Sequence, residues 1–201
     1  MKTLIFFFTT VLLNQLAECS LQDDYFKLSA EDIDGNEVKF EKFKGMVTLV
    51  VNTASLCGFT DGHLRDLTRL HDILSFGDLF SVLAFPCNQF GEQEPGDPAQ
   101  IKQFILVNYN SEFPIFNKVE TIGENAHPVY KNIIAQSSTP PDWNFYKYLV
   151  DHTGRVTHSW GPKVTIPQIF PHVQQAVDAA WVARGGGDMA DKPSELTRDE
   201  L

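Results

Sequence analysis

Two cysteines, Cys57 and Cys87, are the residues of this chain best suited to covalent chemistry. Cys57 stands in the stretch SLCGFT, directly after the apolar run MVTLVVNTA. Disulfide-exchanging proteins place a Cys-x-x-Cys pair at such a point, and here Thr60 occupies the position of the second cysteine. The site can therefore begin thiol chemistry at Cys57, but it needs a thiol from elsewhere to complete it.

Two apolar runs around these cysteines predict neighbouring strands. Residues 47–52 are β-branched and apolar on both faces, which is typical of a central strand covered by helices on both sides. Residues 79–85 form the next strand. Thr60 is the expected N-cap of the helix between them, and Gly77 its expected end. The apolar face of this helix consists of Leu64, Leu67, Leu70, His71 and Leu74. Such a βαβ unit is right-handed and its two strands are parallel. Parallel strands end on the same side, so both cysteines are expected at the same edge of the sheet.

The remaining elements extend this unit on both sides. A hairpin within residues 25–40, around the turn Asp34-Gly35, is expected at the edge of the sheet. The later elements are helices at 98–107 and 127–136, a hairpin of 145–150 with 155–160, and a closing helix at 167–183. A βαβ unit followed by a hairpin and a helix is the thioredoxin arrangement. The predicted fold class is therefore α/β, a thioredoxin-like fold with a mixed central sheet flanked by helices, an N-terminal β-hairpin and an insertion before the second half.

The N-terminus has the layout of a cleaved signal peptide, which we assign to residues 1–19. Lys2 precedes a mostly apolar stretch from Leu4 to Leu13, and Ala17-Glu18-Cys19 follows. A membrane anchor is the competing interpretation, but a spanning helix needs roughly 20 apolar residues, and Asn14 interrupts the stretch earlier. Cleavage after Cys19 leaves two thiols in the mature chain.

The C-terminus carries a second targeting signal. The last four residues, RDEL, are a near variant of the tetrapeptides that a retrieval receptor recognises in the endoplasmic reticulum. They end a polar segment, 185–201, that we expect to be a flexible tail after the folded domain of residues 20–184. Together the two ends predict a protein of the endoplasmic reticulum lumen, with no membrane span and with the retrieval receptor as a partner.

Composition and charge exclude several classes of function. The chain has 201 residues, of which 43% are hydrophobic, enough for one globular domain with its own core. The net charge is −10 and no basic cluster occurs, so a nucleic acid is not an expected partner. The six histidines are scattered, which argues against a metal site. A structural disulfide between Cys57 and Cys87 is the alternative to reactive thiols, although a chain of this length needs no disulfide to fold.

Three segments in order, ASLCGFT, FPCNQFGEQE and WNFYKYLV, resemble the signature segments of the glutathione peroxidase family. The similarity runs from about Tyr25 to Trp181 and is strongest to the branch of the endoplasmic reticulum that uses cysteine in place of selenocysteine. It implies that Cys57 is the peroxidatic thiol and that Gln93, Trp143 and Asn144 complete the family's catalytic tetrad.

The chemistry of these residue types agrees with those roles. A thiolate attacks peroxide, and an ordinary cysteine is mostly protonated at neutral pH. The helix that begins near Thr60 supplies partial positive charge. The side-chain N–H groups of Gln93, Trp143 and Asn144 are donors for the anion and for the departing hydroxide. Taken singly, Gln93 could be only a loop residue, Trp143 only a core aromatic and Asn144 only a turn former.

The residue that resolves the sulfenic acid on Cys57 is left open by the sequence. Thioredoxin-dependent members of the family carry a resolving cysteine where this chain has Leu106. Cys87 is the internal candidate, and motion would be needed for it to reach Cys57. An external thiol is the alternative, either glutathione or protein disulfide isomerase. The segments around the site are acidic, because they contain Asp61, Glu92, Glu94 and Asp97. This acidity favours the protein dithiol over anionic glutathione.

These observations predict a thiol-dependent peroxidase of the endoplasmic reticulum lumen. It would reduce hydrogen peroxide, with lipid hydroperoxides as further substrates, and pass the oxidising equivalents to protein disulfide isomerase or glutathione. No cofactor is expected besides this thiol reductant, and the chain is expected to be a monomer. A non-catalytic thioredoxin-like binding or chaperone module is the alternative, and a disulfide isomerase is disfavoured by Thr60.

Overall fold

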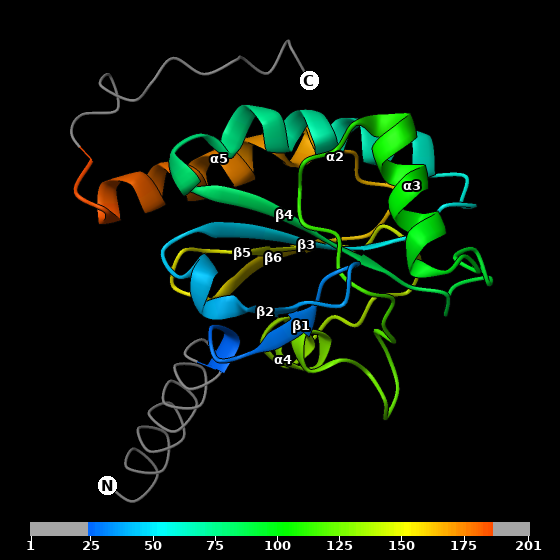
Figure 1. Cartoon of the computed structure of the whole chain (residues 1–201). Coiled ribbons are helices and arrows are strands. Elements are labelled where there is room, and N and C mark those ends of the chain that lie inside the picture. Colours follow the sequence, from blue (N-terminus) through cyan, green and yellow to red (C-terminus); the bar gives the residue numbers. More distant parts are fainter. Residues whose placement is uncertain (1–23, 187–201) are drawn as a thin grey trace, which may run out of the picture.

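The computed structural model describes residues 24–186, and its centre is a mixed sheet. The strand order is β4-β3-β5-β6 (Figure 1), with β3 at Val47–Thr53, β4 at Phe80–Pro86, β5 at Lys147–Val150 and β6 at Val156–Trp160. β3 runs parallel to β4 and antiparallel to β5, and β5 runs antiparallel to β6. The predicted βαβ unit and the later hairpin are thus confirmed, and they share one sheet.

Every residue of β3 and β4 is buried, as the unbroken apolar runs predicted. Successive side chains of a strand point to opposite faces of its sheet. Leu49 and Val51 accordingly join the core under helices α2 and α5, whereas Val50 and Leu83 join the core on the other face. Two hydrophobic cores therefore hold the sheet between them.

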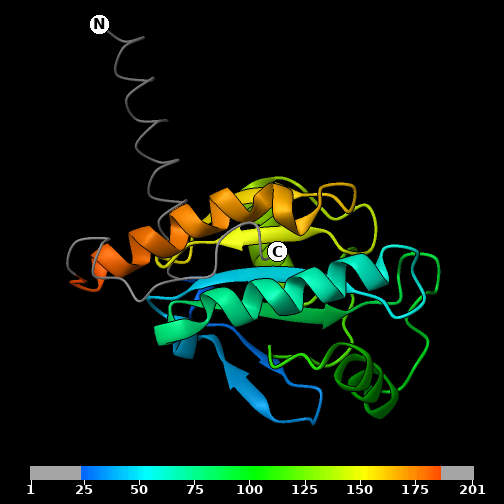
Figure 2. The same cartoon turned by 90° about the horizontal axis from the view of Figure 1, so that it is seen from above.

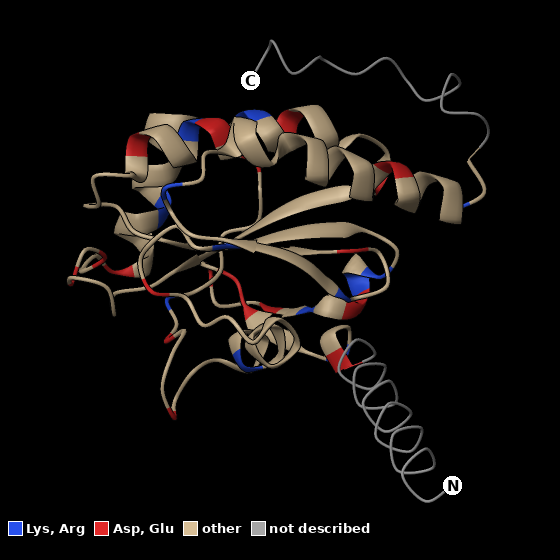
Figure 3. Cartoon of the chain, turned by 180° about the vertical axis from the view of Figure 1, so that it is seen from behind, with Lys and Arg blue, Asp and Glu red and all other residues tan. Residues whose placement is uncertain are grey.

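Helices cover both faces of the sheet. α2 (Thr60–Leu74) and α5 (Ile166–Ala183) lie side by side on one face (Figure 2), and α3 (Pro98–Tyr109) adjoins α2. α4 (Pro128–Ser137) lies on the other face with the N-terminal hairpin (Figure 1). The two helices predicted between β4 and β5, at 98–107 and 127–136, are thus confirmed. Charged residues lie mainly on outer helical surfaces and in loops (Figure 3).

The N-terminal hairpin forms, but its predicted place at the edge of the central sheet is wrong. β1 (Ser29–Glu31) and β2 (Glu37–Lys39) make a separate two-stranded antiparallel sheet. Residues 115 and 116 take up the edge instead, because Ile115 bridges to Ala84 of β4 while Phe116 bridges to Asp32 beside the hairpin. The hairpin is therefore linked to the sheet through this short segment.

The predicted N-cap of α2 is also wrong. Thr60 is the first residue of the helix, and Phe59 is the N-cap without a side-chain hydrogen bond. The Thr60 hydroxyl is engaged with the preceding loop, which explains why it does not cap. The helix ends at Leu74, and the predicted terminator Gly77 lies in the next 3-10 turn with a φ of 72°.

Two predicted segments fall largely or wholly outside the described residues. The signal peptide of residues 1–19 lies wholly outside them. Of the tail of residues 185–201, residues 187–201, which include RDEL, lie outside them. In the part of the chain that the structure describes, no helix is both long and apolar enough to cross a membrane.

Candidate active site

Cys57 lies in the loop between β3 and α2, at the end of the sheet where β3 stops. Its side chain is 8% exposed and belongs to the core under α2 and α5, and its thiol is free. The adjoining Leu56 is 66% exposed. The thiol is thus shielded but close to the surface, as a group that meets a small substrate must be.

Thr60 closes the loop that carries Cys57. Its hydroxyl accepts a hydrogen bond from the Cys57 backbone N–H (3.1 Å) and donates one to the Ala54 carbonyl (2.6 Å). In return the Thr60 backbone N–H donates to the Cys57 carbonyl (3.0 Å). The loop therefore has a fixed conformation just before the N-terminus of a helix, where partial positive charge favours an anion.

Gln93 and Asn144 meet at this loop, although they are far apart in the sequence. The Asn144 side-chain N–H donates to Gln93 Oε1 at 2.9 Å. The Leu56 backbone N–H donates to the Gln93 carbonyl at 3.0 Å, which ties Gln93 to the residue before Cys57. The structure thus brings the Gln93 loop, the Asn144 segment and the Cys57 loop together.

The orientation of Asn144 differs from the expected one. Asn144 is fully buried, and its Nδ2 donates to both the Phe90 carbonyl (3.0 Å) and Gln93 Oε1 (2.9 Å). Both N–H groups are thereby used, so the predicted donation from Asn144 to a Cys57 thiolate does not hold in this structure. Its Oδ1 is buried and has no partner among the described residues. Gln93 accepts through its oxygen, which leaves its own N–H groups as donors.

Trp143 completes this cluster at the surface. Its side chain is 37% exposed and its ring packs against Phe90, with centroids 6.4 Å apart. Gly91 has a φ of +70°, and a Cβ built there would lie 3.5 Å from both Trp143 Cη2 and Gln93 Cδ. The two predicted site residues therefore adjoin one another over Gly91, which needs to be glycine for its backbone conformation.

Asn52 is a site residue that the sequence analysis missed. Its side-chain Nδ2 donates to the Trp143 carbonyl (3.0 Å), and its Oδ1 accepts from the Tyr146 N–H (2.9 Å). Its backbone carbonyl accepts from the Phe145 N–H at 2.7 Å. The signal was present in the sequence, since Asn52 is a buried amide at the end of an apolar strand, and a buried amide needs partners.

Cys87 lies at the same end of the sheet as Cys57 but on the other face. Its backbone N–H donates to the Thr53 carbonyl (3.0 Å), so it directly follows β4 beside the end of β3. Its thiol is fully buried, 3.6 Å from Thr121 Oγ1 and 3.7 Å from Gln89 Oε1, in the segment that leads to α4. Burial raises the pKa of Cys87 despite these hydrogen bonds. Both thiols are free, so the alternative of a structural disulfide is not supported.

One of the four acidic residues named above is not on the surface. Glu94 is 1% exposed, and burial raises the pKa of its carboxyl group. Asp61, Glu92 and Asp97 are exposed, and Asp61 pairs with Arg65 at 2.8 Å. Three of the four acidic residues therefore lie on the surface near the site, and one is buried.

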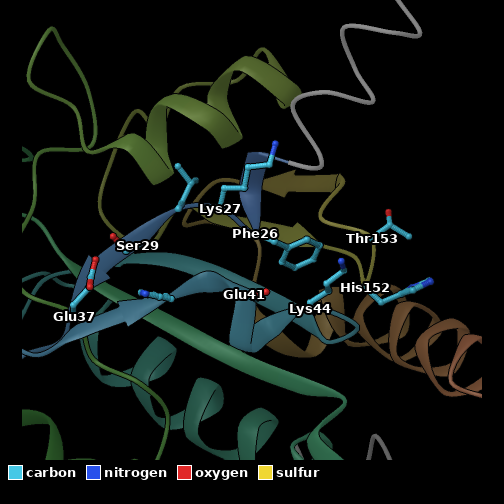
Figure 4. A pocket seen from close by; sticks show the side chains of 10 residues that line it. Phe26, Lys27, Ser29, Glu37, Glu41, Lys44, His152 and Thr153 are labelled. Atoms are coloured by element: carbon cyan, nitrogen blue, oxygen red, sulfur yellow. The ribbon is translucent and has the colours of Figure 1, made fainter.

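Basic side chains gather at the opposite end of the sheet. A hollow of about 880 Å³ lies between the hairpin, the segment before β3 and the turn after β5 (Figure 4). It is lined by Phe26, Lys27, Leu28, Ser29, Glu37, Lys39, Glu41, Lys44, His152 and Thr153. No predicted site residue lines it. An anionic reductant would find these lysines far from Cys57, because they adjoin the beginning of β3 and Cys57 follows its end.

Nothing among residues 24–186 groups three or more side chains of the kinds that hold a metal ion. The histidines are less scattered than the sequence suggested, since His158 of β6 and His172 of α5 have ring centroids 4.6 Å apart.

Comparison with known proteins gives consistent matches. The family model described as "Glutathione peroxidase" matches residues 25–134. The curated human protein "Glutathione peroxidase 7" is 43% identical over 167 residues, which cover 83% of this chain and 89% of that protein. "Probable glutathione peroxidase 8" of Mus musculus is 43% identical over 156 residues, covering 77% of this chain and 74% of that protein.

Solved structures agree with the sequence matches. The crystal structure of Trgpx in apo form has a TM-score of 0.63 and 31% identity, and the match covers 77% of this chain and 95% of that chain. A thiol:disulfide interchange protein of the thioredoxin family from Chlorobium tepidum has a TM-score of 0.59 at 13% identity, over 75% of this chain and 92% of that chain. The second likeness concerns the fold alone and confirms a thioredoxin-like fold.

Proposed function

Since this chain belongs to the glutathione peroxidase family and is a peroxidase, we propose that it reduces hydrogen peroxide through a sulfenic acid on Cys57. The observation that carries this proposal is the junction of three segments at the Cys57 loop. Gln93 is hydrogen-bonded to both Leu56 and Asn144, and Trp143 adjoins Gln93 over Gly91. These contacts support placing the four residues named from the family motifs in one site.

The first step oxidises the sulfur of Cys57. The thiolate attacks one peroxide oxygen and the O–O bond breaks, so that the sulfur gains a hydroxyl group and the other oxygen leaves as hydroxide, which takes up a proton to give water. The N-terminus of α2 favours the thiolate. The N–H groups of Gln93 and the indole N–H of Trp143 are the donors we assign to the departing oxygen.

The second step needs a thiol from outside the chain. A thiol sulfur attacks the sulfur of the Cys57 sulfenic acid, water leaves, and a mixed disulfide forms. A second thiol of the same reductant then releases Cys57 and leaves the reductant as a disulfide. Cys87 is badly placed for this attack, because its thiol is buried on the other face of the sheet and its pKa is raised.

A protein dithiol fits this role better than glutathione. Asp61, Glu92 and Asp97 are exposed, whereas the lysines of the hollow in Figure 4 lie at the opposite end of the sheet. Leu56 and Trp143 give the mouth of the site an apolar rim, which suits the surface of a protein or a lipid hydroperoxide. We assign the reductant to the protein disulfide isomerase class, with glutathione as the competing reductant.

We place the reaction in the lumen of the endoplasmic reticulum, on the basis of residues 1–19 and the terminal RDEL. A test is the secretion of the chain from cultured cells with and without its last four residues. Retention of the full chain and secretion of the shortened chain are expected. Equal secretion of both would contradict the assignment.

Rapid mixing of the mature chain with hydrogen peroxide tests the proposed chemistry. Mass spectrometry after trapping should find a sulfenic acid on Cys57, formed much faster than on a free cysteine, and the variant Cys57→Ser should not consume peroxide. Protein disulfide isomerase or glutathione is then added in separate reactions, and faster reduction by the isomerase is expected. Slow oxidation of Cys57 would refute the proposed function, and faster reduction by glutathione would reassign the reductant.

A further inference from the structure

Lys147 is a fully buried lysine whose ammonium group is completely hydrogen-bonded. It begins β5, and its Nζ lies 2.9 Å from the Phe145 carbonyl, 3.0 Å from the Gly161 carbonyl and 3.2 Å from His63 Nε2. An ammonium group has three N–H donors and no acceptor. Its donors and these three contacts match one to one, which is the arrangement that a buried cation requires.

The tautomer of His63 agrees with a charged lysine. His63 Nδ1 lies 3.2 Å from the Phe59 carbonyl, which can only accept, so Nδ1 carries the proton and Nε2 is left as the acceptor for Lys147. Burial, and then the positive charge of Lys147, lower the pKa of His63 to about 4. The imidazole is therefore neutral at physiological pH and can serve as a hydrogen-bond acceptor.

The contacts of Lys147 join the two segments that meet at Cys57. His63 lies in the first turns of α2, directly beyond the Cys57 loop, and its ring packs on Phe145 with centroids 5.1 Å apart. Phe145 directly follows Asn144 and has a φ of +62°, which is unfavourable for an aromatic residue. Hydrogen bonds to Asn52 and to Lys147 hold both the N–H and the C=O of Phe145 in this conformation.

Lys147 also lies on the same face of the sheet as Cys57. It pairs with Val51 of β3, whose side chain belongs to the core under α2 and α5, and Cys57 belongs to that core as well. Among residues 24–186, the titratable side chain that contacts Lys147 is His63 from α2. The neighbouring β6 contributes Trp160 opposite Lys147, and the buried residues of α5 are apolar.

We propose that Lys147 is a positioning residue of the peroxidatic centre, where its ammonium group fixes the Trp143–Phe145 segment against α2 and adds a buried positive charge to the face that carries Cys57. This inference rests on the proposed role of Cys57. It assigns a function to a lysine that would otherwise only cost free energy to bury.

The charge on Lys147 makes the inference measurable through pH. Burial lowers the pKa of Lys147 to about 7. A neutral amine has one N–H fewer, so one of its three partners is released when the proton leaves. Oxidation of Cys57 should therefore decline around pH 7 as Lys147 loses its proton.

The test measures two rates across the pH range, oxidation of Cys57 by hydrogen peroxide in a single turnover and its alkylation by iodoacetamide. Lys147→Met keeps the length of the side chain without charge or donors, and Lys147→Arg keeps a permanent charge. Lys39→Met, on the exposed hairpin, is the matched control. We expect Lys147→Met to react roughly tenfold more slowly. Neither Lys147 variant should show the decline near pH 7, and the control should behave as the wild type.

Two outcomes would overturn the inference. One is a Lys147→Met variant with the rate and pH profile of the wild type, even if its melting temperature falls. The other is a wild-type protein whose rate of Cys57 oxidation does not decline near pH 7. This second result decides the question even if neither Lys147 variant folds. Slow oxidation of wild-type Cys57 would instead refute the proposed function. In that case the alkylation profile still tests the link between Lys147 and Cys57.

Discussion

The hydroxyl of Thr60 accepts a hydrogen bond from the backbone N–H of Cys57 at 3.1 Å, from the position that the second sulfur takes in a Cys-x-x-Cys motif. The same hydroxyl donates to the Ala54 carbonyl at 2.6 Å. Other thioredoxin-like proteins carry a disulfide-exchanging cysteine at this position, whereas here a hydroxyl holds the loop in place. The loop that carries Cys57 is therefore held by a hydroxyl and not by a second thiol.

Replacing Thr60 by valine should destabilise this loop. Thr60→Val keeps the shape of the side chain but leaves the buried Cys57 N–H and Ala54 C=O without their partner, which costs about 1–3 kcal/mol. Urea unfolding should show this loss, and single-turnover oxidation of Cys57 should slow. Thr60→Ser retains the hydroxyl and is the control. Equal stability and rate in the two variants would show that the hydroxyl has no such role.

Replacing Asn52 by leucine should disturb the site from within the sheet. Asn52→Leu removes the partner of both the Trp143 carbonyl and the Tyr146 N–H. Each buried group left unpaired costs about 1–3 kcal/mol, and the displaced Trp143 should slow peroxide reduction. Asn108→Leu, on the exposed surface of α3, should change stability by only about 0.5 kcal/mol or less. Similar unfolding curves for the two variants would contradict the prediction.

Replacing Cys87 by serine should leave the oxidation of Cys57 unchanged. The Cys87 thiol contacts Thr121 on the other face of the sheet, and its pKa is raised by burial. Without added reductant, mass spectrometry should therefore find a Cys57 sulfenic acid of similar lifetime in the wild type and in Cys87→Ser. A Cys57–Cys87 disulfide that forms rapidly in the wild type would instead make Cys87 the resolving residue.

Replacing Glu94 by glutamine should stabilise the protein at neutral pH. Burial raises the folded-state pKa of Glu94 above that of the unfolded chain, which is about 4.3. The folded state therefore holds this proton more tightly, and the stability it contributes below about pH 4 is lost as pH rises through the folded-state pKa. Glu94→Gln stays neutral, so its advantage in urea unfolding should appear at pH 7 and vanish in acid.

The neighbouring exposed Glu92 supplies the control for this experiment. Glu92→Gln should leave the unfolding free energy unchanged at both pH values, because an exposed carboxylate keeps its water in the folded state. A lower stability of Glu94→Gln at pH 7 would show that the ionised carboxylate makes a favourable contact, for example with Lys118, which is the nearby charge that lowers its pKa.

The strands and helices were predictable because their signals are local. The apolar runs that became β3 and β4, and the spacing of leucines in α2, are patterns of neighbouring residues. The place of the hairpin was not, because it depends on Ile115 taking the edge of β4, which is a contact between distant segments. Local patterns carry no information about which distant segment pairs with an edge strand.

Sequence motifs name the members of the candidate site but not its hydrogen bonds. The motifs named Cys57, Gln93, Trp143 and Asn144, and the structure brings their segments together. The sequence does not reveal that both Asn144 N–H groups are already used, since this depends on where the Phe90 carbonyl points. It equally conceals Lys147, whose charge suggests a surface position until its three acceptors are seen.

Under the proposed mechanism, the separation of the two thiols by the sheet determines whether oxidised Cys57 is protected from further oxidation. A protein that forms an internal disulfide is protected from further peroxide, and its oxidised form can accumulate. Under the proposed mechanism the Cys57 sulfenic acid has no such protection, so each turnover would be a competition between a second peroxide molecule and an incoming thiol. The ratio of reductant to peroxide around the protein, rather than any motion within it, would then decide whether Cys57 is recycled or irreversibly lost.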